Sequence, residues 1–149
     1  MQLKDKNAII YGGGGAVGGA VAKAFAREGA KVFLAGRTLA RVQAVADKIG
    51  GSAEVDALDE AAIERHFAST VEKMGRLDIS FNAVGIRNTK LQGTALTREQ
   101  FAGIITGRTH AKRLRSLLEM ANVAAFAASD HASAMTGTIV NLSLGNLDD

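Results

Sequence analysis

The stretch Lys6–Ala26, KNAIIYGGGGAVGGAVAKAFA, decides the fold of this 149-residue chain. A short apolar run, Ala8–Tyr11, meets the segment Gly12–Gly18, in which five of seven residues are glycine, and a helical pattern of apolar residues follows at once. Glycines let the backbone approach a pyrophosphate closely, and a helix N-terminus offers N–H donors. The pattern Gly13-x-Gly15-x-x-Gly18 between a strand and a helix therefore predicts a dinucleotide site.

Composition predicts one globular domain with a substantial core. Apolar residues make up 47% of the chain and charged residues 22%, with a net charge of +3, which is ordinary for such a protein. There is no cysteine, so disulfides and thiolate metal sites are excluded, and the three histidines are too scattered for a metal motif. No signal-peptide core or membrane-length apolar run is present. We expect a cytoplasmic protein with no metal and no membrane partner.

Strands and helices alternate over the first 85 residues. Thr38 and Asp59 are positioned to cap the second and third helices. This alternation predicts an α/β fold, a Rossmann-like doubly wound parallel sheet with helices on both faces. The predicted strands are Ala8–Tyr11, Lys31–Ala35, Ser52–Val55 and Asp78–Val84.

The rest of the chain predicts two more helices and a last strand. Thr97–Gln100 is a capping box that opens a helix in which Phe101, Ile104 and Ile105 are expected to be buried. A further helix is expected from about His110 to Ala128, with Leu114, Leu117, Leu118, Ala121 and Ala125 on its apolar face. The sequence Thr138–Leu142 is typical of a strand, which would bring the predicted sheet to about five strands. Residues 1–149 are expected to form a single domain.

Polar residues and glycines follow each predicted strand, where an open parallel sheet binds its ligands. Arg37 stands where an acid would bind the ribose 2′-hydroxyl of NAD, and its planar cation suits a 2′-phosphate, so NADP(H) is favoured over NAD(H). The alternative is a solvated arginine at a helix start. Asp56 could accept a hydrogen bond from an adenine amino group or simply form a turn. The predicted cofactor-binding residues are Gly12, Gly13, Gly14, Gly15, Val17, Gly18, Arg37, Thr38, Asp56, Ala57, Asn82, Ala83, Val84 and Gly85.

Several of these motifs resemble the short-chain dehydrogenase/reductase family. Tyr11–Gly18 is similar to its T-G-x-x-x-G-[IV]-G loop, and Asp78–Gly85 to its D-I-L-V-N-N-A-G segment. Residues 1–108 resemble the family's cofactor half, and residues 110–149 resemble its C-terminal end through Glu119–Asp130 and Thr136-Gly137. The resemblance implies an NAD(P)-binding oxidoreductase that transfers hydride between small-molecule alcohols and carbonyls. It also makes Arg37 the NADP-selecting residue and Asp56 the adenine-contacting one.

The resemblance also implies a catalytic Ser, Tyr and Lys, which this chain does not supply in the family's pattern. Tyr11 is the only tyrosine, and the residue four places on is Gly15, so there is no Tyr-x-x-x-Lys. The segment that would hold it is missing, with a join near Gly107–Lys112, so we expect a truncated and catalytically impaired domain. Ser143 is a candidate catalytic residue if Thr138–Leu142 docks beside the fourth strand. Asn82 and His110 could also substitute for lost groups.

Two functions of other classes are alternatives. The first is a non-catalytic remnant that self-associates as a homo-oligomer through uncovered apolar surface. The second is nucleic-acid binding through a basic run of the sequence. We expect this run to be the solvated face of a helix instead, with no nucleic-acid partner, because no groove-reading or aromatic residues accompany it. The run consists of Arg108, His110, Lys112, Arg113 and Arg115.

Overall fold

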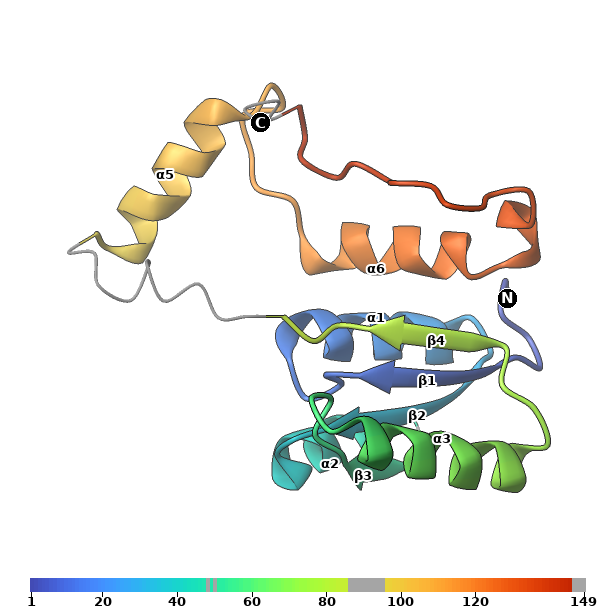
Figure 1. Ribbon diagram of the computed structural model, residues 1–149. Helices are drawn as coiled ribbons and strands as arrows, with labels where there is room; N and C mark the ends of the chain where they lie inside the picture. The colour runs from blue at the N-terminus through green and yellow to red at the C-terminus, as the bar shows by residue number, and fades with distance from the viewer. Residues whose placement is uncertain (48, 50, 86–95, 146–149) are drawn as a thin grey trace.

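The computed structural model describes residues 1–47, 49, 51–85 and 96–145, and the structural statements below concern these residues (Figure 1). Strands and helices alternate as the sequence predicts over the first 85 residues. The elements are β1 (Asn7–Tyr11), α1 (Ala16–Arg27), β2 (Lys31–Gly36), α2 (Leu39–Ala46), β3 (Ser52–Glu54), α3 (Glu60–Met74), β4 (Ile79–Asn82), α5 (Arg98–Arg108), α6 (Leu117–Ala127) and a short 3-10 turn, Asp130–Ala132.

The four strands form one parallel sheet in the order β3-β2-β1-β4. The chain moves outward from β1 to β2 and β3 and then returns to the other side of β1 with β4. The strand order therefore reverses between β1 and β4. At this reversal Tyr11 lies opposite both Ala35 of β2 and Asn82 of β4. Ligands of open α/β sheets bind at such a point, beyond the carboxyl ends of the strands.

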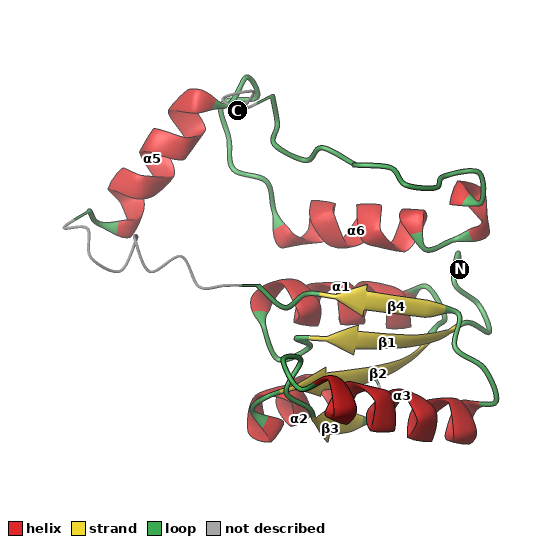
Figure 2. Cartoon of the chain, viewed as in Figure 1, coloured by secondary structure: helices red, strands yellow, loops and turns green. Residues whose placement is uncertain are grey.

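Side chains of the central strands alternate between two apolar clusters. Ala8 and Ile10 of β1 join a cluster formed with α1, α2 and α6, whereas Ile9 and Tyr11 face the residues of α3. Figure 2 shows the result, with α3 in front of the sheet and α1 and α2 behind it. Helices cover both faces, so the predicted α/β, Rossmann-like fold is confirmed. In the first cluster, the Phe25 ring packs edge-on against Phe81, with centroids 6.1 Å apart.

Helix caps follow the local sequence. Asp59 accepts a hydrogen bond from the Ala62 N–H at 3.0 Å and starts α3. Thr97 and Gln100 form both bonds of a capping box at α5, which confirms that prediction. Thr38 is the N-cap residue of α2, but its side chain makes no capping hydrogen bond. Its hydroxyl is therefore not engaged in holding its own helix.

Helix α5 corrects the prediction that Phe101, Ile104 and Ile105 are buried. None of its side chains is buried, and Ile104 is 48% exposed. Figure 1 shows α5 projecting from the layers of the sheet and its helices. The capping box and helical spacing are local and are sufficient to form the helix, but burial needs a neighbouring surface that the described part of the chain does not provide.

Two further predictions for the C-terminal part are wrong. The helix expected from His110 begins only at Leu117, because Ser116 caps it there and Lys112 adopts a left-handed φ of +51°. The basic run is therefore not a helix face. Thr138–Leu142 forms no strand and has no strand partner among the described residues, and Ile139 is 93% exposed. A β-prone sequence needs a pairing edge to become a strand.

Candidate cofactor site at the carboxyl edge of the sheet

The glycine loop is fixed to the ends of two strands by its backbone. The N–H groups of Gly12 and Gly13 both donate to the Ala35 carbonyl of β2, at 2.8 and 3.0 Å. Gly12 has a φ of +77°, a left-handed conformation that glycine adopts without a steric penalty. The loop then closes with a bond from the Gly15 N–H to the Gly12 carbonyl at 3.0 Å. Glycine is thus required here for backbone reasons.

The loop also packs too closely for side chains. A Cβ on Gly12 would lie 3.0 Å from the carbonyl carbon and oxygen of Ala83, just beyond β4. A Cβ on Gly18 would collide with the Gly12 carbonyl oxygen and lie 3.0 Å from the Gly13 Cα. Glycines therefore allow α1, the loop and the end of β4 to meet at the point where the strand order reverses. This is the geometry that brings backbone close to a pyrophosphate.

Helix α1 presents its N-terminus to the same place. Its N-cap is Gly15, which has no side chain to satisfy the first N–H groups, and no acidic residue lies in its first turn. The first-turn N–H groups of any helix lack intrahelical partners, and the helix dipole adds a partial positive charge there. Residues 16–18 therefore offer donors to an anion. This edge fits a phosphate group.

The ends of β2 and β3 carry the residues predicted for the adenosine half. Arg37 and Thr38 are both exposed at the end of β2. Asp56, beyond β3, accepts a hydrogen bond from the Leu58 N–H at 3.1 Å while its own carbonyl accepts one from the Asp59 N–H. The turn-forming alternative for Asp56 is thus satisfied in the structure, and its exposed carboxylate lies on the same edge as Arg37.

Beyond β4, the predicted residues form a tight turn. The Ala83 N–H donates to the Tyr11 carbonyl at 2.9 Å, which continues the pairing of β4 with β1. The Asn82 Oδ1 accepts the Val84 N–H at 2.8 Å, so the amide oxygen holds the turn. A Cβ on Gly85 would meet no atom of the described residues within 4 Å. The structure brings Asn82–Gly85 next to the glycine loop.

Comparisons with known proteins agree with this geometry. Residues 14–110 match the family model described as enoyl-(acyl carrier protein) reductase. The chain belongs to the short-chain dehydrogenase/reductase family. A sorbitol dehydrogenase of Cereibacter sphaeroides is 38% identical over 85 residues, which are 55% of this chain and 33% of that protein. An NADP-dependent (R)-specific alcohol dehydrogenase of Lentilactobacillus kefiri is 36% identical over 103 residues, 66% of this chain and 41% of that protein.

A solved structure shows the same fold. The hydroxysteroid dehydrogenase of Escherichia coli superposes with a TM-score of 0.81 at 17% sequence identity, covering 98% of each chain. At that identity the likeness concerns the fold. The matched stretches of the two enzymes above span less than half of their own lengths.

Tyr11, the chain's only tyrosine, is buried against α3. It is 8% exposed, its ring meets the His66 ring edge-on at 5.9 Å, and neither the Tyr11 hydroxyl nor the His66 Nδ1 has a hydrogen-bond partner in the described structure. Burial raises the pKa of Tyr11. Burial, with Lys73 nearby, lowers the pKa of His66. A buried tyrosine with a raised pKa is poorly suited to exchange protons with a substrate.

Of the other residues proposed for catalysis, Asn82 ends β4, whereas Ser143 and His110 belong to the C-terminal part of the chain. Because Thr138–Leu142 forms no strand beside β4, the condition that would bring Ser143 there is not met. Ser143 instead lines a cavity of about 650 Å³ between α6 and the C-terminal segment. His110 packs against the same segment, since a Cβ on Gly145 would lie 2.8 Å from its ring. The cavity is lined by Arg115, Glu119, Met120, Asn122, Val123, Asn141, Leu142, Ser143, Leu144 and Gly145.

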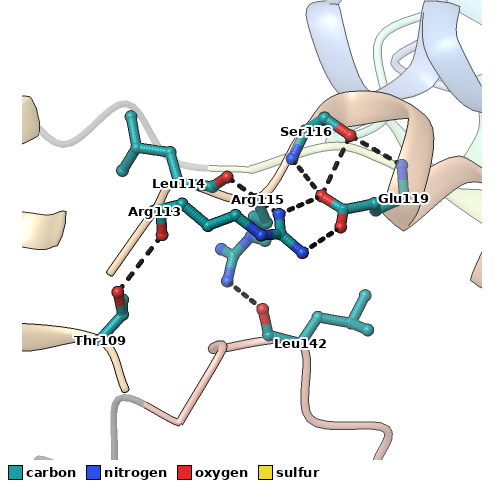
Figure 3. Close-up of polar contacts among 7 residues, drawn as sticks. All are labelled: Thr109, Arg113, Leu114, Arg115, Ser116, Glu119 and Leu142. Carbon is teal, nitrogen blue, oxygen red and sulfur yellow. Dashed lines mark hydrogen bonds and ion pairs between the residues drawn. The ribbon is translucent and has the colours of Figure 1, made fainter. Parts of the chain in front are cut away.

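A network of charged hydrogen bonds holds this C-terminal part together (Figure 3). Arg113 donates to both carboxylate oxygens of Glu119, at 2.9 and 2.6 Å, and Ser116 and Glu119 complete the capping box of α6. These bonds, with that of Arg113 first, lower the pKa of Glu119 to about 2. Arg115 donates to the Leu142 carbonyl at 2.9 Å. Two residues of the basic run thus have structural partners here.

The described residues contain neither a metal-binding cluster nor a helix that could span a membrane. No group of three or more histidines and carboxylates is placed to hold a metal ion. Among those same residues, no helix has the length and apolar character needed to span a bilayer.

One residue near the glycine loop was missed by sequence reasoning. A Cβ on Gly14 would lie 2.9 Å from the Cβ of Arg41, so the loop rests on the first turn of α2. The sequence feature that could have pointed to Arg41 is its spacing of four residues from Arg37. Arg37 precedes the helix, and Arg41 lies in its first turn.

Proposed function

We propose that this chain binds NADP(H) at the carboxyl edge of its sheet and is impaired in the hydride transfer typical of its family. The observation that carries the proposal is the combination found there. The close-packed loop Gly12–Gly18 meets a free helix N-terminus, and Arg37 follows β2 where an acid would mark NAD. The NADP dependence of the related alcohol dehydrogenase supports the same choice.

Each group at the edge has a proposed role. Residues 12–18 would hold the pyrophosphate through backbone N–H groups, Arg37 and Thr38 the ribose 2′-phosphate, and Asp56 and Ala57 the adenine. Asn82–Gly85 would line the path toward the nicotinamide. The bound nicotinamide would supply or accept the hydride, and a small-molecule carbonyl or alcohol would be its partner. The sequence-based expectation of a cytoplasmic location is part of this proposal.

Catalytic impairment is proposed because proton transfer lacks its usual groups. Tyr11 is the only tyrosine and is buried, with no lysine four residues later. A positioned acid/base group typically contributes about 10²–10⁴-fold to the rate. We attribute the loss to a segment absent near Gly107–Lys112. Residue Lys112 there holds a left-handed turn and donates to the Gly107 carbonyl at 2.8 Å, which ties the two ends of the interval together.

Cofactor binding is tested by titrating the chain with NADPH and NADH while nicotinamide fluorescence is followed. We expect NADPH to bind at least tenfold more tightly than NADH, and Arg37→Ala to remove most of that difference. Arg65→Ala, an exposed arginine of α3, is the matched control and should change neither affinity. Failure of both dinucleotides to bind at millimolar concentration refutes the proposal. Equal affinities refute the role of Arg37.

Catalysis is tested by NADPH oxidation with a panel of aldehydes and ketones. We expect rates no higher than a protein-free blank. Turnover above the blank that Ser143→Ala, Asn82→Ala or His110→Ala abolishes would contradict the impairment and identify the group that replaces the lost tyrosine. The three variants thus separate the three substitutes proposed from the sequence.

A second candidate function is self-association without useful cofactor affinity. The observation that favours it is apolar surface exposed on α5, between α5 and α6, on α6 and after α6. The large exposed apolar side chains there are Ile104, Leu114, Leu117, Leu118, Phe126, Met135, Ile139 and Val140. Contiguous exposed apolar surface often marks an interface. Light scattering after size exclusion distinguishes the two functions, since a monomer that binds NADPH favours the first and an oligomer that binds no dinucleotide favours the second.

A further inference from the structure

The glycine loop packs against the first turn of α2. A Cβ on Gly14 would lie 2.9 Å from the Arg41 Cβ, 3.1 Å from the Arg41 carbonyl carbon and 3.1 Å from the Val42 nitrogen. The side chain of Arg41 therefore starts directly against Gly14. The Arg41 side chain is exposed to solvent. Thr38 is the N-cap residue of this same helix, and Arg37 directly precedes it.

The charge balance of that turn is unusual. Arg41 occupies the third position of α2, where the helix dipole disfavours a cation, and the first turn contains no acidic residue. Neither Arg37 nor Arg41 belongs to an ion pair within the described ranges. The carboxylate of Asp47, at the other end of α2, accepts a hydrogen bond from Gln43 instead. Two exposed guanidinium groups thus lie at one helix start without a carboxylate to neutralise them.

We propose that Arg41 is a second specificity-determining cation, which binds the 2′-phosphate of the dinucleotide together with Arg37. This inference rests on the proposed function, since it concerns the same ligand. A phosphate dianion has three terminal oxygens, and each arginine can donate two parallel hydrogen bonds to such a group. Arg37 approaches from the end of β2 and Arg41 from the side of the glycine loop. An anion bound between them would also offset the unfavourable interaction of the Arg41 charge with the helix dipole.

The test compares 2′,5′-ADP with ADP, and NADPH with NADH, on the full chain by calorimetric titration. Arg41→Ala should weaken 2′,5′-ADP and NADPH by about 10-fold, which is the effect of losing one hydrogen bond to a charged group, and leave ADP and NADH within about twofold. Arg41→Lys should retain part of the affinity, because it keeps the charge but not the fork. Arg65→Ala is the control and should change none of the four affinities.

The outcomes separate this inference from the proposed function. If the unmodified chain binds NADPH more tightly than NADH and Arg41→Ala keeps that ratio, the inference is wrong and the proposed function stands. If Arg41→Ala weakens all four ligands equally while its urea midpoint is unchanged, Arg41 does not recognise the 2′-phosphate, and the inference is again wrong. If the unmodified chain binds none of the four ligands at millimolar concentration, both are wrong.

Discussion

The part of the chain up to residue 85 and the part from residue 96 onward are built in different ways. The first buries large side chains completely, and its fully buried members are Phe25, Leu3, Ile9, Ile10, Leu34, Val21, Val32 and Val42. The second buries only small or polar ones, namely Ala121, Ala125, Ala132, Thr109 and Ser129. Its helix α6 packs along α1 through the two alanines. The first part is thus held by apolar packing, and the second by caps, charged hydrogen bonds and one helix contact.

This difference bears on function because the proposed cofactor site lies wholly in the first part. Loop Gly12–Gly18, Arg37 and Asn82 are placed by strands whose side chains form the core. Ser143 and His110 belong to the second part, in which no large side chain among the described residues is buried. Groups that move protons must be held in precise geometry. Within this chain, the better-packed part therefore carries the proposed binding residues and Asn82, and the less-packed part carries the candidate catalytic residues Ser143 and His110.

The largest expected effect tests the contrast in packing directly. Phe25→Ala removes a side chain that is 0% exposed and packs against Phe81, so it should lower the free energy of unfolding by about 3–5 kcal/mol. Ile104→Ala on α5 is the matched control and should cost less than about 0.5 kcal/mol, because Ile104 is already exposed. Urea unfolding followed by far-UV circular dichroism measures both. A large loss from Ile104→Ala would show that α5 packs against a surface in solution.

The next effect concerns two neighbouring glycines of α1. Gly18→Ala places a Cβ against the backbone of Gly12 and Gly13, which cannot shift aside as the end of a flexible side chain can. This variant should therefore destabilise the fold by about 1–3 kcal/mol. Gly19→Ala is the control, because its Cβ would meet Gly13 and Val45 at an ordinary 3.5 Å. It should stabilise the helix by up to about 1 kcal/mol. Urea midpoints that fall equally in the two variants would contradict the close packing of the loop.

Acid should loosen the second part in a way that depends on Glu119. Its pKa is lowered from 4.5 to about 2 in the folded chain, so its stabilising contribution is complete above pH 4.5 and is lost as the pH falls toward 2. The Cα chemical shifts of Leu117–Ala127 should therefore move toward unfolded values in that pH window, and they should do so at a higher pH than the Cα shifts of α1. Glu119→Gln serves as the comparison and should flatten this dependence. Identical titration of α1 and α6 in both proteins would contradict a separate, charge-held region.

Sequence alone was sufficient for the first part because its signals are local. The glycine loop needs a left-handed residue at Gly12, and the strands Asn7–Tyr11 and Lys31–Gly36 carry runs that can be buried on both faces. The capping residue Asp59 likewise acts on its own helix, as Thr97 does in the second part. Each of these features is decided within a few residues, so periodicity and turn chemistry predict it.

Prediction failed where a distant neighbour decides the outcome. Thr138–Leu142 has the composition of a strand, but pairing requires an edge that it does not reach in the described structure. Helix α5 has its capping box, yet the surface that would bury Ile104 is not supplied by the described residues. The role proposed for Arg41 rests on its contact with Gly14. The two residues are 27 positions apart in the chain, so a sequence pattern does not reveal this contact.

The smallest expected effect tests a polar group inside the better-packed part. Tyr11→Phe removes a buried hydroxyl that has no partner among the described residues, so it should leave the urea midpoint unchanged or raise stability by about 1 kcal/mol. Thr70→Val is the control, because the Thr70 hydroxyl is buried nearby and donates to the His66 carbonyl at 2.8 Å, and its loss should cost about 1 kcal/mol. Of the two changes, only Thr70→Val is therefore expected to destabilise the chain. If Tyr11→Phe instead destabilises as much as Thr70→Val, the Tyr11 hydroxyl is hydrogen-bonded in solution, and water reaches the cluster between β1 and α3.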